Sequence, residues 1–440
     1  FLIRMKNFFL SFICIALVVP QAFSQKTPFK FGKVPMEELT MQSYEKDPSA
    51  EAVVLYDQGF TSISYNVNTG WKLDFKRTCR IKIFNSTGFE WANEKIPLYD
   101  YGSYEENVHG LKGYTYNLVD GKVVESKLGK DNIFDEAMSK KMKAVKFTMP
   151  NVKEGSVIEF TYTISSNYLI ELKEWQFQKS IPIAWSEYTL KHPEYFTYLH
   201  LAQGFEQFED HKVTNEAGSL LVDNETMNYK VDVYYWLARD MPALKNESYI
   251  SNASNFYQKV AFQWASYRSP GGNYEPILGT WEKINSELLT SSDFGVQMKP
   301  KGFYKDVLAS ITADAKDQKE IATLIYKYIS ENIKWNEVYY FIPEHNIKKT
   351  FDEKTGRSAD INMLLISMLN AAGIKANAVI TSTRNNGMIN PVHPIIDKYN
   401  YLLAEAIIDG NTYLMDATAK NLPLGMLPPR HVAHVPLHQI

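Results

Sequence analysis

The chain has only two cysteines, which excludes a fold built on several disulfides. Cys14 lies inside an N-terminal apolar run that we expect to be removed on export, which leaves Cys79 without a partner. Cys79 occupies an alternating apolar segment with no histidine or helix start beside it to activate a thiol. We therefore interpret Cys79 as core packing instead of a nucleophile.

The sequence also lacks an excess of positive charge and any long apolar run beyond its N-terminus. Its 47 Lys and Arg residues meet 50 Asp and Glu residues, so the net charge of -3 excludes an electrostatic nucleic-acid binder. Glycine-rich phosphate loops, dinucleotide fingerprints and paired-cysteine motifs are missing, so no cofactor or metal is predicted. We expect no membrane span in the mature chain.

The N-terminus has the pattern of an export signal. Lys6 precedes the apolar run 8–19, and Ala22-Phe23-Ser24 supplies the small residues that a signal peptidase requires. We predict a signal peptide over residues 5–24, with a membrane anchor as the alternative. The expected location is the periplasm or cell surface of a Gram-negative bacterium.

Residues 25–250 are predicted to form a β-rich N-terminal domain. Hydrophobic residues make up 45% of the chain and aromatic residues 14%, a composition typical of packed, strand-rich proteins. Residues 71–83 and 156–164 alternate apolar and polar side chains with the period of a half-buried strand. With further strand-like segments between residues 52 and 244, the pattern indicates a large antiparallel sandwich or an open barrel-like fold.

Residues 255–430 change to an α+β pattern, which makes the predicted fold class multidomain. Helical periodicity runs through TWEKINSELL, KGFYKDVLASI and DQKEIATLIYKYISENI, and again from Ile361 to Ala372, where Gly373 suits a helix end. Three strands follow, the last two joined by the turn Asp409-Gly410. Residues 431–440 are expected to form a tail. A C-terminal truncation is the alternative for this tail, because the strand-like pattern ends near residue 428.

Three segments of this region resemble the transglutaminase-like superfamily. They are KTGRSADINMLLISMLNAAGIKANAVI, KYNYLLAEAIIDG and YLMDATAKNLPLGMLP. The N-terminal half is similar to the β-rich domain of unknown function 3857 of exported bacterial proteins, through VKEGSVIEFTYTI, WQFQKSIPIAWSEYTLKHPE and ARDMPALKNESYI. The resemblance implies a papain-like α+β fold and a Cys-His-Asp centre.

The resemblance also implies a chemistry, which this sequence departs from at two positions. In the family, a thiol at a helix start is activated by a histidine that an aspartate orients, and it attacks an amide carbonyl. The matching positions here are Ser358, Tyr401 and Asp416, so only the aspartate is kept. The resemblance therefore implies a degenerate triad, because a serine needs a base and a tyrosine keeps its proton at neutral pH.

Each of these residues also has a purely structural interpretation. Ser358 is expected to be a helix N-cap, next to an Asp360 favoured by the helix dipole. Tyr401 is expected to be a half-buried strand aromatic. Asp416 is either a remnant of the triad or a turn former at a strand end, and it is expected to accept a hydrogen bond from the Tyr401 hydroxyl.

Four histidines were considered as a replacement base or as metal ligands. His393 lies in a proline-flanked loop just before Tyr401 and is the nearest base in sequence, although a surface histidine is the simpler interpretation. The spacing of His431, His434 and His438 would suit a metal, but no acidic or cysteine ligand stands beside them, and a frayed tail is expected.

Two functions fit these observations. The first is an exported pseudoenzyme that binds or scaffolds a peptide, a protein or a cell-envelope glycopeptide. The second is an active acyl-transfer enzyme, of the amidase, peptidase or transglutaminase type, that uses Ser358 with an unusual base such as His393. The missing base at position 401 favours the first, so we predict that the chain is not an enzyme.

Overall fold

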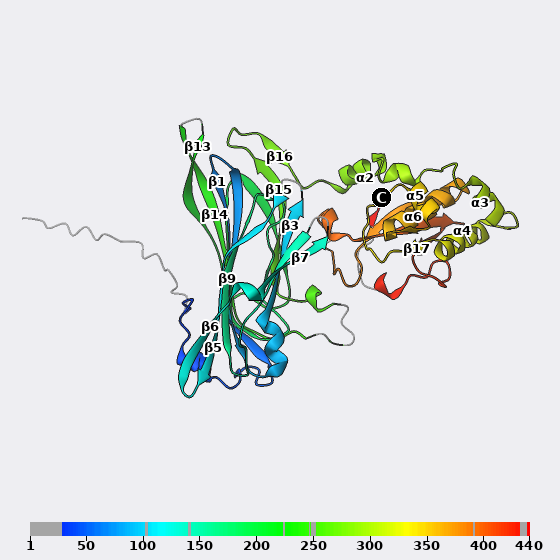
Figure 1. The fold of residues 1–440 in the computed structure, drawn as a ribbon. Coiled ribbons are helices and arrows are strands. Elements are labelled where there is room, and N and C mark those ends of the chain that lie inside the picture. Colours follow the sequence, from blue (N-terminus) through cyan, green and yellow to red (C-terminus); the bar gives the residue numbers. More distant parts are fainter. Residues whose placement is uncertain are drawn as a thin grey trace, which may run out of the picture.

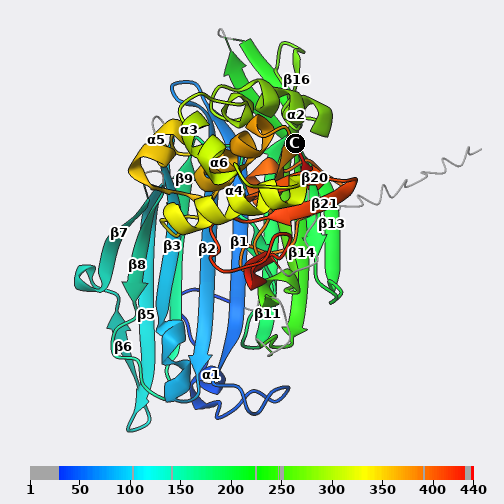
Figure 2. The ribbon, with the colours of Figure 1, turned by 90° about the vertical axis from the view of Figure 1, so that its right-hand side faces the viewer.

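The computed structural model describes residues 29–101, 104–139, 142–222, 225–245, 247, 252–389, 392–431 and 438–440. The predicted signal peptide and His434 lie outside these residues. Figures 1 and 2 show a part built from long strands, residues 29–276, standing beside a part that carries the longer helices, residues 281–440. We call them the β-rich part and the helical part. The predicted multidomain fold class is confirmed.

The β-rich part is centred on one eight-stranded sheet. Its order is β13 (Asp210–Val222), β14 (Glu225–Met241), β11 (Ile183–Pro193), β1 (Ala52–Asn66), β2 (Gly70–Ile83), β9 (Val157–Ser166), β5 (Asn107–Val119) and β6 (Lys122–Lys127). Neighbouring strands are antiparallel except β1 and β11, which pair in parallel. A fully antiparallel fold was expected, but the long excursion between β1 and β11 lets the chain return in the same direction.

Two four-stranded sheets complete this part, together with short helices. One has the order β10 (Trp175–Gln176), β15 (Lys259–Arg268), β12 (Phe196–Gln203), with β16 (Tyr274–Pro276) on β15. The other is β4 (Tyr104–Glu105), β3 (Asn93–Tyr101), β8 (Met142–Thr148), β7 (Ile133–Ser139). The helices are α1 (Met36–Thr40), η1 (Ser86–Ala92), η2 (Lys130–Asn132) and η3 (Ala253–Asn255).

In strand β2, the apolar residues of the alternating pattern are buried in the core. Leu73, Phe75 and Cys79 are buried as predicted, and burial raises the pKa of the Cys79 thiol well above its usual value, in agreement with a packing role. The other face was expected to be solvated. Arg80 and Lys82 lie on it and are nevertheless buried.

The segment 30–39 explains this difference, because it covers the polar face of β2. Arg80 donates to Glu159 (2.8 Å) and Glu38 (2.9 Å), and its Nη2 also donates to the carbonyls of Lys30 and Lys33. Glu159 is fully buried. We call this the Arg80 cluster, and it attaches the N-terminal segment to the sheet by charged hydrogen bonds.

The helical part packs its helices around a small sheet. The helices are α2 (Trp281–Thr290), η4 (Gly295–Met298), α3 (Lys305–Ile311), α4 (Gln318–Asn332), α5 (Ile347–Glu353), α6 (Ser358–Ala371), η5 (Ile396–Lys398) and η6 (Pro429–His431). The sheet order is β21 (Asn411–Met415), β20 (Tyr401–Ile408), β19 (Lys375–Thr381), β22 (His438–Gln439), and β17 (Lys334–Trp335) pairs with β18 (Thr355–Gly356).

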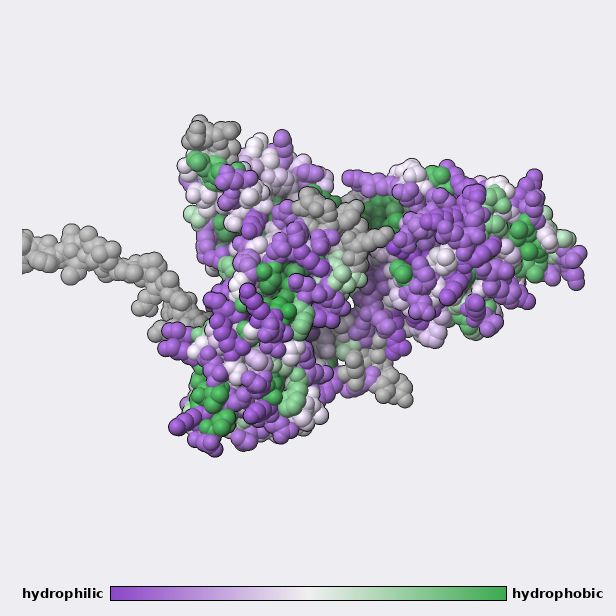
Figure 3. Space-filling model, viewed as in Figure 1, coloured by the Kyte–Doolittle hydropathy of each residue, from purple (hydrophilic) through white to green (hydrophobic). Residues whose placement is uncertain are grey.

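Helix α6 is the centre of this part. Every residue from Ser358 to Leu369 is buried, because β19 and β20 cover one side of the helix while α4 and α5 cover others. A single apolar stripe was expected, so the sequence pattern underestimated how completely α6 is enclosed. Gly373 adopts φ +79°, the left-handed conformation expected at the helix end. The outer face of the helical part is mostly hydrophilic in the view of Figure 3.

No helix in the described ranges combines the length and apolarity needed to cross a bilayer.

Candidate functional site

Ser358 is the first residue of α6, and its hydroxyl is held by the preceding loop. Its Oγ donates to the carbonyl of Tyr340 (2.9 Å) and accepts from the Tyr340 N–H (3.3 Å). The predicted N-cap role is wrong by one position: Arg357 is the N-cap, with extended backbone, and its N–H donates to Asp360 (2.8 Å). Ser358 is fully buried, and its two hydrogen bonds to the backbone of Tyr340 hold the Tyr340 loop against the start of α6.

Tyr401 opens β20 and is fully buried, where a half-buried position was expected. Its hydroxyl donates to Asp416 at 2.9 Å from Oδ2 and 3.1 Å from Oδ1, which confirms the expected bond between these two residues. Burial raises the pKa of Tyr401 well above its usual value, and the charge of Asp416 raises it further. Tyr401 is therefore a neutral hydrogen-bond donor.

Asp416 follows β21 directly and is fully buried. Burial by itself would raise its pKa, but the hydrogen bond from His431 and the charge of Arg430 hold the pKa below the usual range. Thr418 also donates to it, through Oγ1 at 2.8 Å. The carboxylate is thus ionised and surrounded by donors. We call Asp416 and the donors Asn362, Tyr401, Thr418, Arg430 and His431 the Asp416 cluster.

Asn362 connects this cluster to the helix that carries Ser358. It lies one turn after Ser358, and its Nδ2 donates to Asp416 Oδ1 (3.1 Å) and to the carbonyl of Leu402 (2.8 Å). Its Oδ1 accepts the N–H of Ala417 (2.8 Å). Asn362 was not predicted as a site residue, although a polar residue inside an otherwise apolar helix pattern is the signal that identifies such a group.

Arg430 and His431 reach Asp416 from η6, where the predicted domain 255–430 meets the segment 431–440 that was expected to be a frayed tail. Arg430 Nη2 donates to Asp416 Oδ2 (2.6 Å), and His431 Nε2 lies 3.0 Å from the same oxygen. The His431 side chain is only 2% exposed, and its ring meets Tyr401 edge-on at 4.5 Å between centroids. The prediction of a frayed tail is wrong here, because charge pairing orders the segment. Farther along, β22 pairs with β19.

The three predicted positions occupy one region, but only two of them touch. Tyr401 and Asp416 bond directly. Ser358 is connected to them through its loop, in which Tyr339 packs 5.8 Å from the Tyr401 ring. Across the residues that the structure describes, no hydrogen bond joins Ser358 to Tyr401, to Asp416 or to His393.

A metal is not indicated within the described ranges, since no group of three or more His, Cys, Asp or Glu side chains is placed to hold one. His431 is instead committed to Asp416. In β22, the backbone of His438 pairs with Ile380.

A cavity of about 390 Å³ opens beside the Asp416 cluster. Arg430 and Pro429 form one wall and Tyr339 another, while the remaining lining residues are polar: Thr383, Arg384, Asn385, Asn386 and Asn400. The lining contains no carboxylate. A ligand in this cavity would therefore meet the guanidinium side of the cluster, with Asp416 behind it.

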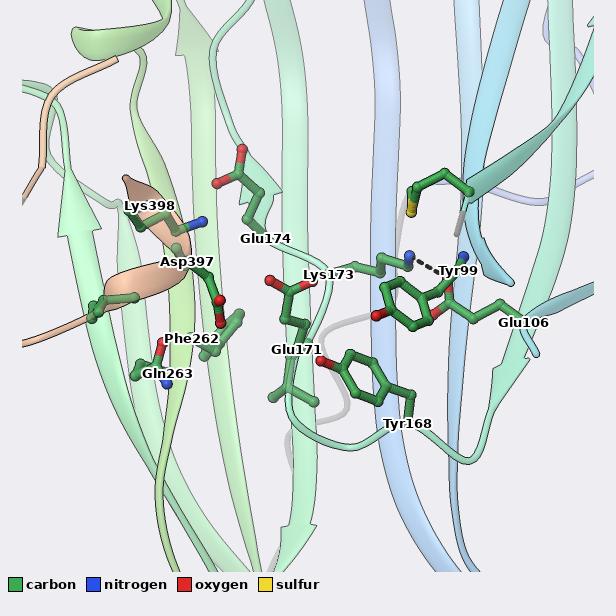
Figure 4. A pocket seen from close by; sticks show the side chains of 14 residues that line it. Tyr99, Glu106, Tyr168, Glu171, Lys173, Glu174, Phe262, Gln263, Asp397 and Lys398 are labelled. Carbon is green, nitrogen blue, oxygen red and sulfur yellow. Dashed lines mark hydrogen bonds and ion pairs between the residues drawn. The ribbon is translucent and has the colours of Figure 1, made fainter. Parts of the chain in front are cut away.

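A second cavity, of about 270 Å³, lies where the two parts of the chain meet (Figure 4). Tyr99 and Tyr168 stack with ring centroids 4.7 Å apart on the β-rich side, and Asp397 and Lys398 of η5 reach it from the helical part. It shares no lining residue with the cavity beside Arg430, so it is separate from the Asp416 cluster.

Comparison with known proteins identifies both parts. Residues 305–416 match the transglutaminase-like superfamily, and residues 72–245 match the domain of unknown function with solved structure DUF3857. No curated protein matches the chain.

Two solved structures illustrate the likeness. A "putative protease" from Parabacteroides distasonis is 16% identical with a TM-score of 0.54, over 83% of this chain and 67% of that one. A "putative cysteine protease" from Cytophaga hutchinsonii is 13% identical with a TM-score of 0.22, over 56% of this chain and 74% of that one. At these identities the first likeness concerns the fold alone. The chain thus contains a DUF3857 domain over residues 72–245, followed by a transglutaminase-like domain over residues 305–416.

Proposed function

We propose that the transglutaminase-like domain is a pseudoenzyme with a binding or scaffolding role. Ser358 and Tyr401 would stand at the thiol and imidazole positions of the family, next to the retained Asp416. The working parts would extend over residues 25–250 and 255–430, after a signal peptide at 5–24 that directs the protein to the cell envelope.

The contacts of Asp416 are the observation that carries this proposal. In an acyl-transfer centre the aspartate orients an imidazole, which takes the proton of the nucleophile. Here its oxygens face Arg430 and the Tyr401 hydroxyl, neither of which can take a proton, and the imidazole of His431, which in the described structure makes no hydrogen bond to Ser358. A lost general base typically costs about 10²- to 10⁴-fold in rate, and a hydroxyl in place of a thiol adds to that loss.

The state of Ser358 supports the same conclusion. Its hydroxyl donates to a backbone carbonyl at 2.9 Å, and a carbonyl cannot act as a base. Attack on an amide would first require Ser358 to leave this bond and its buried position. The positive end of the α6 dipole is present, but it helps an anion and does not remove a proton from an alcohol.

One observation favours the second candidate, an active acyl-transfer enzyme. His431 and Asp416 form an imidazole–carboxylate pair, and His431 Nδ1 is buried without a partner. A movement of the Tyr340 loop that brought Ser358 to this nitrogen would assemble a serine centre with His431, instead of His393, as its base.

Turnover assays separate the two candidates. The purified chain would be incubated with peptide amides and with a glutamine peptide plus a fluorescent amine, beside the variants Ser358→Ala and His431→Ala. The pseudoenzyme predicts equal background rates in all three proteins. Amide cleavage or amine incorporation that both substitutions abolish would establish the enzyme instead.

The binding role has its own test, in which the mature chain retrieves peptides and cell-envelope glycopeptides from a fractionated envelope. Retention that is lost when the 390 Å³ cavity is blocked by Asn400→Trp would support it. Equal retention by that variant would place binding elsewhere.

A further inference from the structure

The contacts of the Arg430 side chain resemble those that a binding site makes with the guanidinium group of a ligand. Its Nη2 donates to the carboxylate of Asp416 (2.6 Å) and to the hydroxyl of Thr418 (2.5 Å). Its guanidinium carbon lies 4.8 Å from the centre of the Trp335 ring and 5.6 Å from that of Tyr401. A buried carboxylate, a hydroxyl and aromatic faces together match the charge, the donors and the flat surface of a guanidinium.

The receptor side of this site is assembled by elements other than η6, which carries Arg430. Asn362 of α6 fixes Asp416 Oδ1 at 3.1 Å, and Tyr401 of β20 donates to both carboxylate oxygens. Asp416 and Tyr401 are fully buried, whereas the Arg430 side chain is 22% exposed. The carboxylate therefore belongs to a rigid frame, and the arginine enters that frame from outside.

Among the described residues, one backbone hydrogen bond attaches the segment that carries Arg430 to the rest of the fold, and the side chain of the adjoining His431 also reaches Asp416 Oδ2 (3.0 Å). The N–H of Arg384 donates to the Arg430 carbonyl (2.9 Å), and the N–H of His431 closes a turn onto Pro428 (3.0 Å). Pro429 and Arg430 form a wall of the 390 Å³ cavity, so a shift of this short segment would join the cavity to Asp416. The segment 428–431 thus occupies the position of a ligand.

We propose that the Asp416 cluster is an arginine-recognition site, filled by the chain's own Arg430, and that its ligand in trans is a peptide segment bearing an arginine. This inference rests on the proposed binding function and gives it a ligand class. The incoming guanidinium takes the place of Arg430 between Trp335 and Asp416, and its peptide backbone lies in the cavity lined by Asn385, Asn386 and Asn400.

The chain's own segment 428–431 competes with such a ligand for the Asp416 cluster. A tethered side chain acts at an effective concentration of about 1 mM or more, so the wild-type chain binds a free arginine only weakly. Removal of the Arg430 side chain leaves the frame in place and vacates the site. The variant Arg430→Ala should therefore bind arginine derivatives that the wild-type chain does not.

The experiment is a calorimetric titration of full-length Arg430→Ala with N-acetylarginine methylamide. The matched control ligand is N-acetylcitrulline methylamide, which has the same shape without the charge. We expect saturable binding of the arginine derivative at least about tenfold tighter than that of citrulline, and at least about tenfold tighter than in the wild-type chain. Adding Asp416→Asn to the variant should abolish the preference.

A folded Arg430→Ala variant that does not bind, or that binds citrulline equally well, overturns the proposal. If this variant does not fold, hydrogen exchange on the wild-type chain decides. Saturating arginine derivative should speed exchange of the Arg430 and His431 amides severalfold, and unchanged exchange overturns the proposal. If the arginine-binding experiment fails, the proposal that the chain is a pseudoenzyme is unaffected. Turnover that requires Ser358 would contradict the pseudoenzyme proposal without bearing on arginine binding.

Discussion

Arg80 and Arg430 both pair with buried carboxylates, and they differ in how completely their guanidinium groups are engaged. Arg80 is 1% exposed, its partner Glu159 is fully buried, and carboxylates and backbone carbonyls from the segment 30–39 and from β9 satisfy it on several sides. Arg430 is 22% exposed, donates through one nitrogen and borders a cavity. The Arg80 cluster therefore fastens the segment 30–39 to the sheet, whereas the exposed side of Arg430 remains accessible to a ligand in the cavity.

The difference shows that a buried ion pair alone does not indicate a function. Both pairs have a carboxylate without solvent exposure, and both arginines lie against an aromatic ring, Phe29 for Arg80 and Trp335 for Arg430. Only the second pair adjoins a cavity and a short, replaceable segment. Four sets of substitutions test this contrast, in order of decreasing effect.

Arg80→Ala should have the largest effect on stability. Its loss leaves Glu159 buried and uncompensated, which typically costs about 3–5 kcal/mol. Urea unfolding of the β-rich part, followed by circular dichroism, would measure the cost. The control is Arg239→Ala, which removes an exposed pair with Glu209 and should cost no more than about 1 kcal/mol. Equal costs for the two variants would show that the Arg80 cluster is not structural.

Restoring the family residues tests whether Arg430 blocks the centre. With Ser358→Cys and Tyr401→His alone, Arg430 still engages Asp416, so amide turnover should stay at background. Adding Arg430→Ala removes the guanidinium from Asp416, so that the new imidazole competes for the carboxylate with His431 alone, and turnover should rise by about 10²-fold. Activity already present in the double variant would show that Arg430 does not occupy the catalytic position.

Asp416→Asn should lower stability by about 1–3 kcal/mol near neutral pH, because the Arg430 guanidinium loses its counter-charge. The pKa of Asp416 is depressed in the folded chain, so its contribution is complete above the ordinary value of about 3.9 and is lost as pH falls through the folded pKa. The difference between wild type and variant should therefore shrink below about pH 4.

Unfolding at several pH values measures this difference. Asp409→Asn, in the exposed hairpin turn, is the matched control and should show no such trend. A difference that grows as the solution becomes more acidic would contradict an ionised Asp416.

Ser358→Ala should have the smallest effect, about 1 kcal/mol, because water can reach the partly exposed Tyr340 that loses its bonds. Ser367→Ala is the comparison within α6. Ser367 donates to the Lys299 carbonyl (2.7 Å) and contacts the buried Tyr304 hydroxyl (2.7 Å), so its loss should cost more. A larger loss of stability for Ser358→Ala than for Ser367→Ala would show that the hydrogen bonds of Ser358 stabilise the fold more than its contacts indicate.

Periodicity predicted most elements of the fold because their burial is local in sequence. The alternation in β2 and β9 and the helical pattern of α4 and α6 identify these elements directly. Periodicity failed for Arg80, which lies on the polar face of β2 and is buried only because the segment 30–39 returns over it. No local pattern encodes such a return.

The candidate site was predicted in part for the same reason. Tyr401 and Asp416 were placed together through the resemblance, and their hydrogen bond follows from neighbouring strands. Arg430 and His431 lie in a segment without periodicity, and their role depends on η6 folding back onto β21. The charge of Arg430 next to two prolines was the available signal, and for His431 the expectation of a frayed tail overrode it.

The most direct test of the central claim is covalent labelling of the wild-type chain with a fluorophosphonate, followed by intact-mass spectrometry. If the Asp416 cluster serves binding and not catalysis, wild type and Ser358→Ala should both stay unmodified after prolonged exposure. A single added phosphonyl group in the wild-type chain, absent from Ser358→Ala and His431→Ala, would contradict the account and identify a working serine centre.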